Sequence, residues 1–319
     1  MILIAIVTLG FMSQAIFAQA IKVDDQLPKY KKTTGISGNA NSIGSDTMNN
    51  LMALWLEEFR KLYPLVNIQI EGKGSSTAPP ALIEGTAQFG PMSRAMKSKE
   101  VDAFEQKYGF APAQIRTSLD ALAVFVHKDN PLECLSMDQV DAIFSKTRKR
   151  GYPNDIATWG DLGLGGDWKN QPIRVYGRNS ASGTYGFFKD HMLKKGDYKD
   201  SVKEQPGSAS VVQGIGEDKY AIGYSGIGYK TSGVKTLSLS EKQGDTCFDG
   251  SYENVVSDKY LLSRYLYLYI VKTPNKSLDP LVKEFLKFVL SYEGQQIVVK
   301  DGYLPLPYDV VMEELKKLD

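Results

Sequence analysis

The feature that most constrains the fold is a repeated order of an apolar strand, a loop rich in glycine and serine, and an amphipathic helix. One unit is VNIQIEG followed by GKGSSTAPPALIEG, in which residues 66, 68 and 70 alternate as a half-buried strand. Another is PIRVYG, followed by the loop RNSASG and the helical run TYGFFKDHMLKKG. Strands that alternate with helices predict an α/β architecture with mostly parallel sheets.

Helical spacing is clearest in DTMNNLMALWLEEFRKLYP, whose apolar residues fall on one face and whose run ends at Pro64. Ser45, Asp46 and Thr47 precede this helix and are interpreted as its capping residues. The stretch PLVKEFLKFVLSYEGQQIVVK predicts one long amphipathic helix near the end of the chain. ALAVFVHKDNP, AIGYSGIGY and YLLSRYLYLYIVK predict further strands, and LSMDQVDAIFS a short helix.

Two segments before residue 38 differ from the rest of the chain. Residues 1–20 carry no charge, are largely apolar and end in Ala18-Gln19-Ala20, which predicts a secretory signal peptide cleaved after Ala20. Residues 21–37 are polar and rich in lysine without periodicity, which predicts a flexible extension. The protein is therefore expected to be exported.

The composition is that of a globular protein with one large domain or two lobes: 319 residues, 42% hydrophobic and 24% charged. The formal charge is only +1, from 38 basic and 37 acidic residues, so nothing favours a nucleic-acid partner. An anion would have to be bound by local geometry rather than by overall charge.

Three loops offer hydroxyl groups where a helix is predicted to begin: residues 45–47, 75–77 and 182–184. The first turn of a helix has unpaired backbone N–H groups and a partial positive charge, which together with hydroxyls can hold a small oxyanion. Arg178 would add a forked cation suited to two oxygens of a phosphate or sulfate. Each loop alone could equally be a helix cap, and their meeting in space is an expectation.

Catalytic and metal-binding interpretations find little support. GYSGIG does not match the Gly-x-Ser-x-Gly of common serine hydrolases. Beyond its glycine, the loop after Arg178 has Tyr185 and not the lysine that a nucleotide loop requires. His127 and His191 lie in predicted regular structure and are interpreted as packing or surface residues; two histidines exclude a histidine-rich metal site. Cys134 and Cys247 form either one disulfide or two separate buried thiols.

Five stretches resemble, in order, the motifs of phosphate-binding proteins of bacterial phosphate ABC transporters, the PstS family. They are GSDTM, GKGSSTAPPALIEGTAQFGPMSR, YGRNSASGTYGFF, EQPGSASVV and AIGYSGIGY. The resemblance covers roughly residues 38–308, and its most specific part is the Arg-x3-Ser-Gly-Thr element at 178–184. It implies a two-lobed periplasmic-binding-protein fold of type II, with the ligand in a cleft between lobes joined by hinge strands that bend to close it.

The resemblance also implies domains and ligand contacts. Lobe I would comprise residues 38–127 plus 251–319, and lobe II residues 128–250. The family pattern assigns phosphate contacts to Thr47, Met48, Ser75, Arg178, Ser182, Gly183 and Thr184, with Ser45 and Ser93 as secondary contacts. The implied partners are inorganic phosphate and the membrane permease of an ABC transporter; no cofactor is expected, and the protein is expected to be a periplasmic monomer.

The chain departs from the family at the group that accepts the proton of bound phosphate. Many members have Ser-Asp after the second helix, whereas this chain has Ser93-Arg94. That acceptor discriminates against sulfate, which has no proton to donate at neutral pH. Asp46 is the candidate substitute, with a role as helix cap as its alternative, and Arg94 either adds a second cation or forms a structural ion pair. Ser180 also replaces an acidic residue that pairs with the arginine in some relatives.

The sequence thus predicts an exported, non-catalytic phosphate receptor. One alternative is a receptor for another tetrahedral oxyanion such as sulfate, arsenate or molybdate. The other is a secreted phosphoesterase or surface protein that reuses the fold, and turnover of a chromogenic phosphate ester would distinguish it.

Overall fold

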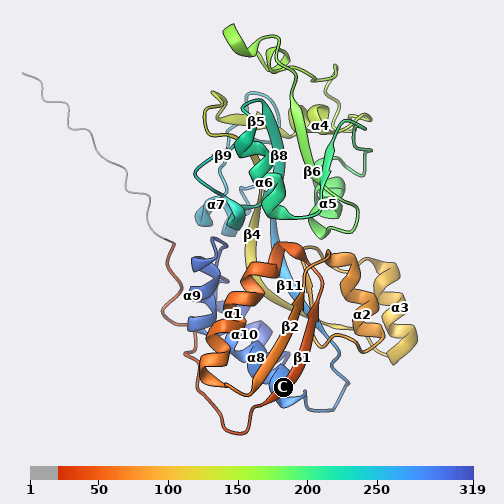
Figure 1. Cartoon of the computed structure of the whole chain (residues 1–319), viewed down its shortest axis with the longest axis vertical. Coiled ribbons are helices and arrows are strands. Elements are labelled where there is room, and N and C mark those ends of the chain that lie inside the picture. Colours follow the sequence, from red (N-terminus) through yellow and green to blue (C-terminus); the bar gives the residue numbers. More distant parts are fainter. Residues whose placement is uncertain (1–20) are drawn as a thin grey trace, which may run out of the picture.

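The computed structural model describes residues 21–319, so the predicted signal peptide lies outside the described residues. Two lobes are stacked along the long axis of the molecule, and two strands, β4 and β11, run between them (Figure 1). The prediction of a two-lobed α/β fold is confirmed. Among residues 21–319, no helix combines the length and the apolar character that crossing a membrane requires.

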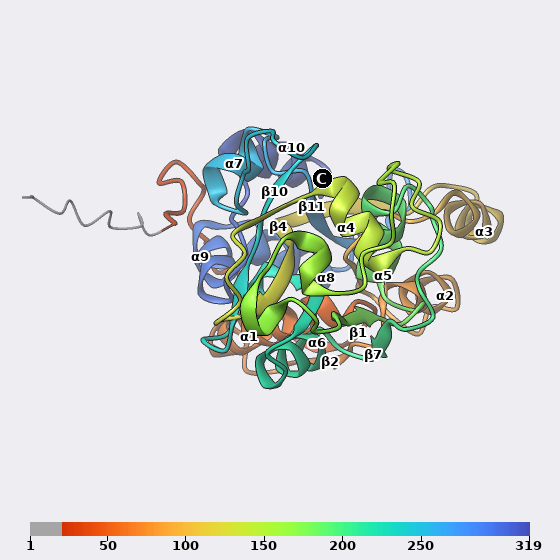
Figure 2. The same ribbon diagram turned by 90° about the horizontal axis from the view of Figure 1, so that it is seen from above.

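Lobe I, in the lower half of Figure 1, has three short strands and six helices in the described part of the chain. Its strands are β1 (Gly38–Ile43), β2 (Val66–Glu71) and β3 (Gly90–Met92). Its helices are α1 (Asn49–Leu62), α2 (Ala78–Ile83), α3 (Ser98–Tyr108), α8 (Pro280–Val289), α9 (Tyr292–Lys300) and α10 (Tyr308–Lys316). Seen from above, α2 and α3 lie on one flank and α9 on the opposite flank (Figure 2).

Lobe II, in the upper half, contains β5 to β10, α4, α5 and α6. The strands are β5 (Cys134–Ser136), β6 (Arg174–Arg178), β7 (Lys203–Gln205), β8 (Ala221–Gly226), β9 (Val234–Thr236) and β10 (Ser238–Ser240). The helices are α4 (Met137–Phe144), α5 (Gly183–Phe187), which continues as a π-helical turn over Phe188–Met192, and α6 (Ser208–Glu217). The short α7 (Tyr252–Val256) precedes β11.

Strand β4 (Ala113–His127) belongs to both lobes. Residues 113–121 pair with β11 (Ser263–Ile270), which also pairs with β3, whereas residues 122–127 pair with β8 and β9. All of these pairings are antiparallel, while β1–β2, β5–β10, β6–β7 and β6–β8 are parallel. The prediction of mostly parallel sheets holds for the two-stranded sheets β1–β2 and β5–β10 but is wrong for the large sheet, because the strands that connect the lobes run antiparallel to their neighbours.

The long helix predicted near the end of the chain is two helices, α8 and α9, separated at Leu290 and Ser291. The Ser291 side chain caps α9 by accepting a hydrogen bond from Gly294 N at 3.2 Å. The close packing requires glycine at 294, because a Cβ there would lie 2.1 Å from the Phe288 carbonyl oxygen. Trp55 donates its Nε1–H to the Gly294 carbonyl at 2.9 Å, which fixes α9 against α1.

The segment 21–37 packs against lobe I, so the prediction of a flexible extension is wrong. Val23 and Leu27 are buried, and the ring of Tyr30 stands edge-on to Phe288 with centroids 5.4 Å apart. The Tyr30 hydroxyl lies 2.6 Å from the Tyr63 hydroxyl. Widely spaced apolar residues anchor this segment, although its overall composition is polar.

Candidate functional site

The three hydroxyl-bearing loops meet between the lobes. Thr47 Oγ1 of lobe I lies 2.9 Å from Thr184 Oγ1 of lobe II. Ser76 donates both its backbone N–H, at 3.1 Å, and its hydroxyl, at 3.0 Å, to the Ala181 carbonyl of lobe II. The structure therefore brings together the loops at 45–47, 75–77 and 182–184, as the sequence predicted.

The local fold explains why these loops converge. Strands β1 and β2 are parallel and in register, so the loops that follow them leave the same edge of lobe I. Glycine allows the backbones to approach across the lobes. A Cβ at Gly183 would lie 2.2 Å from Ser75 Oγ, and one at Gly74 would lie 2.5 Å from the Ala181 carbonyl oxygen.

Arg178 is the central cation of the site, and its side chain is only 1% exposed. Its guanidinium donates from Nη1 to Ser208 Oγ at 2.6 Å and from Nη2 to the Pro206 carbonyl at 3.1 Å. Nε is also buried but has no hydrogen-bond partner among residues 21–319. A buried donor without a partner costs free energy, so this atom indicates a place where an acceptor binds.

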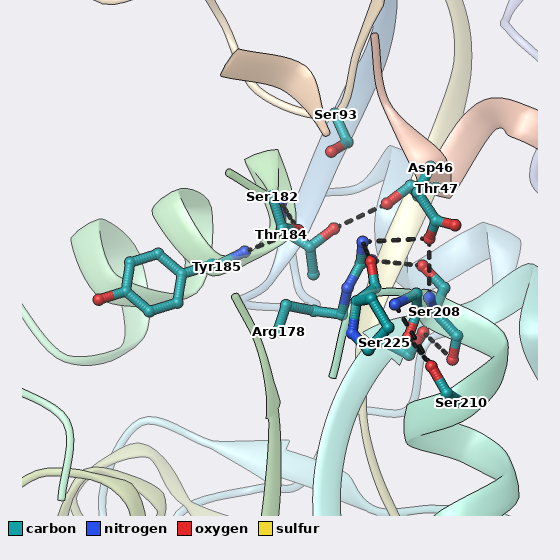
Figure 3. A network of polar contacts seen from close by, with 12 residues as sticks. Asp46, Thr47, Ser93, Arg178, Ser182, Thr184, Tyr185, Ser208, Ser210 and Ser225 are labelled. Carbon is teal, nitrogen blue, oxygen red and sulfur yellow. Dashed lines mark hydrogen bonds and ion pairs between the residues drawn. The ribbon is translucent and has the colours of Figure 1, made fainter. Parts of the chain in front are cut away.

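Asp46 pairs with Arg178 across the lobes (Figure 3). Its Oδ1 lies 3.1 Å from Arg178 Nη2 and accepts the Ser208 N–H at 2.7 Å. Burial lowers the pKa of the Arg178 guanidinium, and the carboxylate of Asp46 opposes that shift. Asp46 thus supplies the acidic partner that Ser180 does not provide.

The first two loops do not use their side chains as helix caps. Residues 46–48 form a 3-10 turn before α1, and neither this turn nor that at 75–77 has a side-chain capping hydrogen bond. The interpretation of Ser45, Asp46 and Thr47 as caps is therefore wrong. Ser45 Oγ is buried and has no hydrogen-bond partner within residues 21–319.

Ser182 does cap its helix. Its Oγ accepts hydrogen bonds from Thr184 N at 3.1 Å and Tyr185 N at 3.3 Å, at the start of α5 (Figure 3). The Met48 side chain is fully buried in the core, and its N–H donates to the Ser45 carbonyl at 3.2 Å. Met48 therefore supports the loop through the core, and Ser182 fixes the turn that carries Gly183 and Thr184.

Ser75 and Ser93 lie together behind the loops. Their hydroxyl oxygens are 3.2 Å apart, and Ser93 N donates to Ser75 Oγ at 3.0 Å. Arg94 points away from them and forms a two-pronged ion pair with Glu100, with both contacts at 2.7 Å. Of the two roles open for Arg94, the structure shows the ion pair.

Sequence reasoning missed a second buried arginine, Arg264 on β11. It pairs with the fully buried Asp120 on β4 through Nε at 2.9 Å and Nη2 at 2.7 Å, and its Nη2 also donates to Thr184 Oγ1 at 3.0 Å. The available signal was one lone charge in each of two apolar stretches, TSLDALAVFV and LLSRYLYLYI. Ser208, in the EQPGSASVV stretch, was also missed as the partner of Arg178.

Arg264 forms part of a groove of about 480 Å³ between the lobes, lined also by Arg94, Lys97, Phe187, His191 and Tyr267. His191 stacks on Phe187 with ring centroids 4.1 Å apart, and burial lowers the pKa of its imidazole. His127 lies 3.7 Å from the Asp129 carboxylate. Residues 21–319 hold no cluster of three or more side chains suited to binding a metal ion.

Cys134 and Cys247 form a disulfide in lobe II, with their Cα atoms 6.3 Å apart. Cys134 lies on β5, which pairs with β10, and Cys247 follows β10 in the chain. Of the two states that the sequence left open for these cysteines, the structure shows the bonded one.

Comparison with known proteins defines the class of this fold and site. A family model described as a PBP superfamily domain matches residues 31–293. A Clostridium perfringens structure, of a substrate-binding protein assigned to phosphate ABC transport and solved with bound phosphate, superposes with a TM-score of 0.71. It is 26% identical and covers 85% of this chain and 100% of that chain.

Curated relatives narrow the class. The phosphate-binding protein PstS of Pseudomonas aeruginosa strain PAO1 is 58% identical over 296 residues, which are 93% of this chain and 92% of that protein. PstS of Staphylococcus haemolyticus is 28% identical, covering 89% of this chain and 86% of that protein. The chain belongs to the PBP superfamily and, within it, to the PstS family.

Proposed function

We infer that this protein captures inorganic phosphate between its lobes and delivers it to the permease of an ABC transporter. The observation that carries the proposal is the buried Arg178, whose Nε lacks a partner within the described residues, beside hydroxyls from both lobes. The relative that is 58% identical is named as a phosphate-binding protein, which supports phosphate as the ligand.

The proposed ligand contacts are those that the family pattern implies. Arg178 supplies charge and a forked donor, and Ser75, Thr47 and Thr184 supply hydroxyls. The backbone N–H groups of Thr47 and Gly183 are proposed as further donors, because those of Met48 and Thr184 already donate to the Ser45 carbonyl and to Ser182 Oγ. Ser45 and Ser93 are proposed as secondary contacts. A micromolar dissociation constant corresponds to about −8 kcal/mol. Roughly ten hydrogen bonds to a charged ligand, at ~1.5–3 kcal/mol each before the costs of ordering, can supply it.

Asp46 is proposed as the acceptor of the phosphate proton. Its Oδ1 already takes the contacts from Arg178 and Ser208, so Oδ2 is the oxygen left to accept the proton. Hydrogen phosphate can donate to a carboxylate, whereas sulfate would bring a lone pair against it. Arg94 has no part in this selection, because Glu100 holds its guanidinium.

The protein acts as a receptor and not as an enzyme. Within the described residues, the hydroxyl oxygen of Ser182 accepts hydrogen bonds from backbone amides only, so no general base activates it. All the proposed contacts come from one chain, so a monomer carries a complete site. The apolar leader supports export to the periplasm with cleavage after Ala20, and the lobes are proposed to divide at residues 127/128 and 250/251.

Calorimetric titration of phosphate-stripped protein with phosphate and, separately, with sulfate tests the function. We expect one-to-one phosphate binding and no heat from sulfate. Equal binding of both anions would mean that the Asp46 carboxylate serves only as the partner of Arg178. The site would then accept any tetrahedral oxyanion. Absence of binding to either, or turnover of a chromogenic phosphate ester, would overturn the proposal.

Asp46→Asn tests the acceptor in the same titration. The amide keeps the size of the side chain but can no longer accept as a carboxylate does, so we expect phosphate affinity to fall about 10-fold, or ~1.4 kcal/mol, while sulfate binding rises. Selectivity equal to that of the unaltered protein would show that Asp46 serves only Arg178.

A further inference from the structure

A buried ion pair lies on the two strands that connect the lobes. Asp120 on β4 and Arg264 on β11 stand opposite each other in the antiparallel ladder. Asp120 is fully buried and Arg264 nearly so, and Asp120 Oδ2 accepts from both Nε and Nη2 of the guanidinium. Desolvating two charges is expensive, and further hydrogen bonds to the pair offset part of that cost.

The further hydrogen bonds of the pair reach both lobes. Arg264 Nη1 donates to the Ser93 carbonyl of lobe I at 2.9 Å, directly behind Ser75. Its Nη2 donates to Thr184 Oγ1 of lobe II at 3.0 Å. On the other side, Asp120 Oδ1 accepts the Ile227 N–H of lobe II at 3.0 Å.

Helix α5 receives two contacts from Arg264. One is the hydrogen bond to Thr184, and the other is the Phe187 ring, whose centroid lies 5.3 Å from the guanidinium carbon. Thr184 and Phe187 are one helical turn apart and both face the hinge strand. Arg264 thus holds the short helix whose first turn carries the proposed phosphate contacts.

These contacts depend on how the lobes are placed. Thr184 and Phe187 move with lobe II, whereas Arg264 and its partner Asp120 belong to the hinge strands β11 and β4. Opening the cleft by rotation about β4 and β11 breaks the contacts with α5, but it leaves the ion pair itself intact. These contacts therefore stabilise the closed form but not the open form.

We propose that Arg264, held by Asp120, is a positioning residue that fastens α5 to the hinge strands when the lobes close and so slows the release of phosphate. The inference rests on the proposed phosphate-binding function. Arg264 reaches the ligand through Thr184, so its effect falls mainly on the dissociation rate.

The chain offers a matched control in Arg116. It lies on β4, the strand that carries Asp120, and pairs with two carboxylates of lobe I, Glu313 and Glu314. Arg264→Lys keeps the positive charge beside Asp120 but loses the planar fork that reaches Ser93 and Thr184 together. Arg116→Lys makes the same chemical change without touching α5.

Stopped-flow kinetics with inorganic phosphate give the association and dissociation rates of the unaltered protein and both variants. We expect Arg264→Lys to raise the dissociation rate about 10-fold with association within about threefold, and Arg116→Lys to change neither. Phe187→Leu, which removes only the ring from beneath the guanidinium, is expected to raise dissociation about threefold. This variant keeps the test open if Arg264→Lys does not fold.

Small-angle scattering adds a readout of closure. With saturating phosphate, the radius of gyration of Arg264→Lys should stay nearer its ligand-free value than that of the unaltered protein. The inference about Arg264 would be overturned, and the proposed function kept, if the unaltered protein binds phosphate tightly but the dissociation rate is unchanged in both Arg264→Lys and Phe187→Leu. A loss confined to the association rate would overturn it too, whereas no phosphate binding by the unaltered protein would overturn the proposed function.

Discussion

Lobe I brings a carboxylate and hydroxyls to the cleft through Asp46, Thr47 and Ser75, whereas lobe II brings the cation through Arg178 and the turn that follows it. The cores of the two lobes are also stabilised by different interactions. Lobe I has an aromatic cluster in which Phe59 packs on Phe285 and Phe288, with ring centroids 5.3 and 5.5 Å apart. Lobe II adds a disulfide to its core.

The division of the carboxylate and the cation between the lobes shows that neither lobe holds a complete site. Within residues 21–319, the acidic partner of Arg178 lies in the opposite lobe, and Thr184 contacts Thr47 of lobe I and Arg264 of the connecting strand β11. Arg94 gives the contrast within lobe I, because it finds its partner six residues away in Glu100 and is satisfied locally.

Removing the cation of lobe II is expected to have the largest effect. Arg178→Ala deletes the buried charge and the Nε donor that has no partner within residues 21–319, so phosphate affinity should fall at least 100-fold, or about 3 kcal/mol. Calorimetry measures the loss, and circular dichroism checks that the fold persists. Phosphate affinity equal to that of the unaltered protein would contradict the assignment of the site.

Opening the disulfide tests what holds lobe II. Replacing both Cys134 and Cys247 by serine frees a closed stretch with a sequence separation of 113 residues, so the free energy of unfolding should fall by about 2–4 kcal/mol. Urea denaturation without phosphate measures this loss, since bound ligand would mask it. Phosphate affinity should change less than threefold. A larger loss of affinity would show that the disulfide also maintains the geometry of the binding site.

Breaking the ion pair of Arg94 is expected to cost stability but not binding. Arg94→Met leaves the partly exposed Glu100 unpaired and should lower the free energy of unfolding by about 1–2 kcal/mol. The double variant with Glu100→Gln should recover part of that loss. A fall in phosphate affinity comparable to that of Arg178→Ala would erase the distinction between the two arginines.

The smallest expected effect is at Asp301, which follows α9 at the side of lobe I that meets Gly228 of lobe II. Burial raises the pKa of this carboxyl to about 6 from 3.8, and Asn50 donates a hydrogen bond to it. The folded state therefore holds its proton more tightly than the unfolded state. This stabilisation is present below about pH 4 and is lost as pH rises through 6.

Asp301→Asn should accordingly raise the free energy of unfolding by about 1 kcal/mol at pH 8 and leave it unchanged at pH 4. Urea denaturation at the two pH values measures the difference. An equal rise in the free energy of unfolding at both pH values would mean that it comes from packing and not from loss of the Asp301 charge.

Much of this fold could be predicted from local pattern. The apolar face of α1, the strand and loop before α2, and the loop that carries Arg178 all follow from short-range periodicity and glycine placement. The break between α8 and α9 could not be predicted so easily, because it depends on the packing of Gly294 against Phe288 and Trp55. The anchoring of residues 21–37 likewise depends on Tyr63 and Phe288, far away in the chain.

The sequence by itself determined the α/β class, the three serine loops and the candidate cation Arg178, because each is written in a few consecutive residues. The tertiary structure alone decided that Asp46 pairs with Arg178, that Cys134 and Cys247 are bonded, and that Asp120 meets Arg264. The physical reason is that charge pairing acts through space: the last pair is 144 residues apart in sequence but opposite in one ladder.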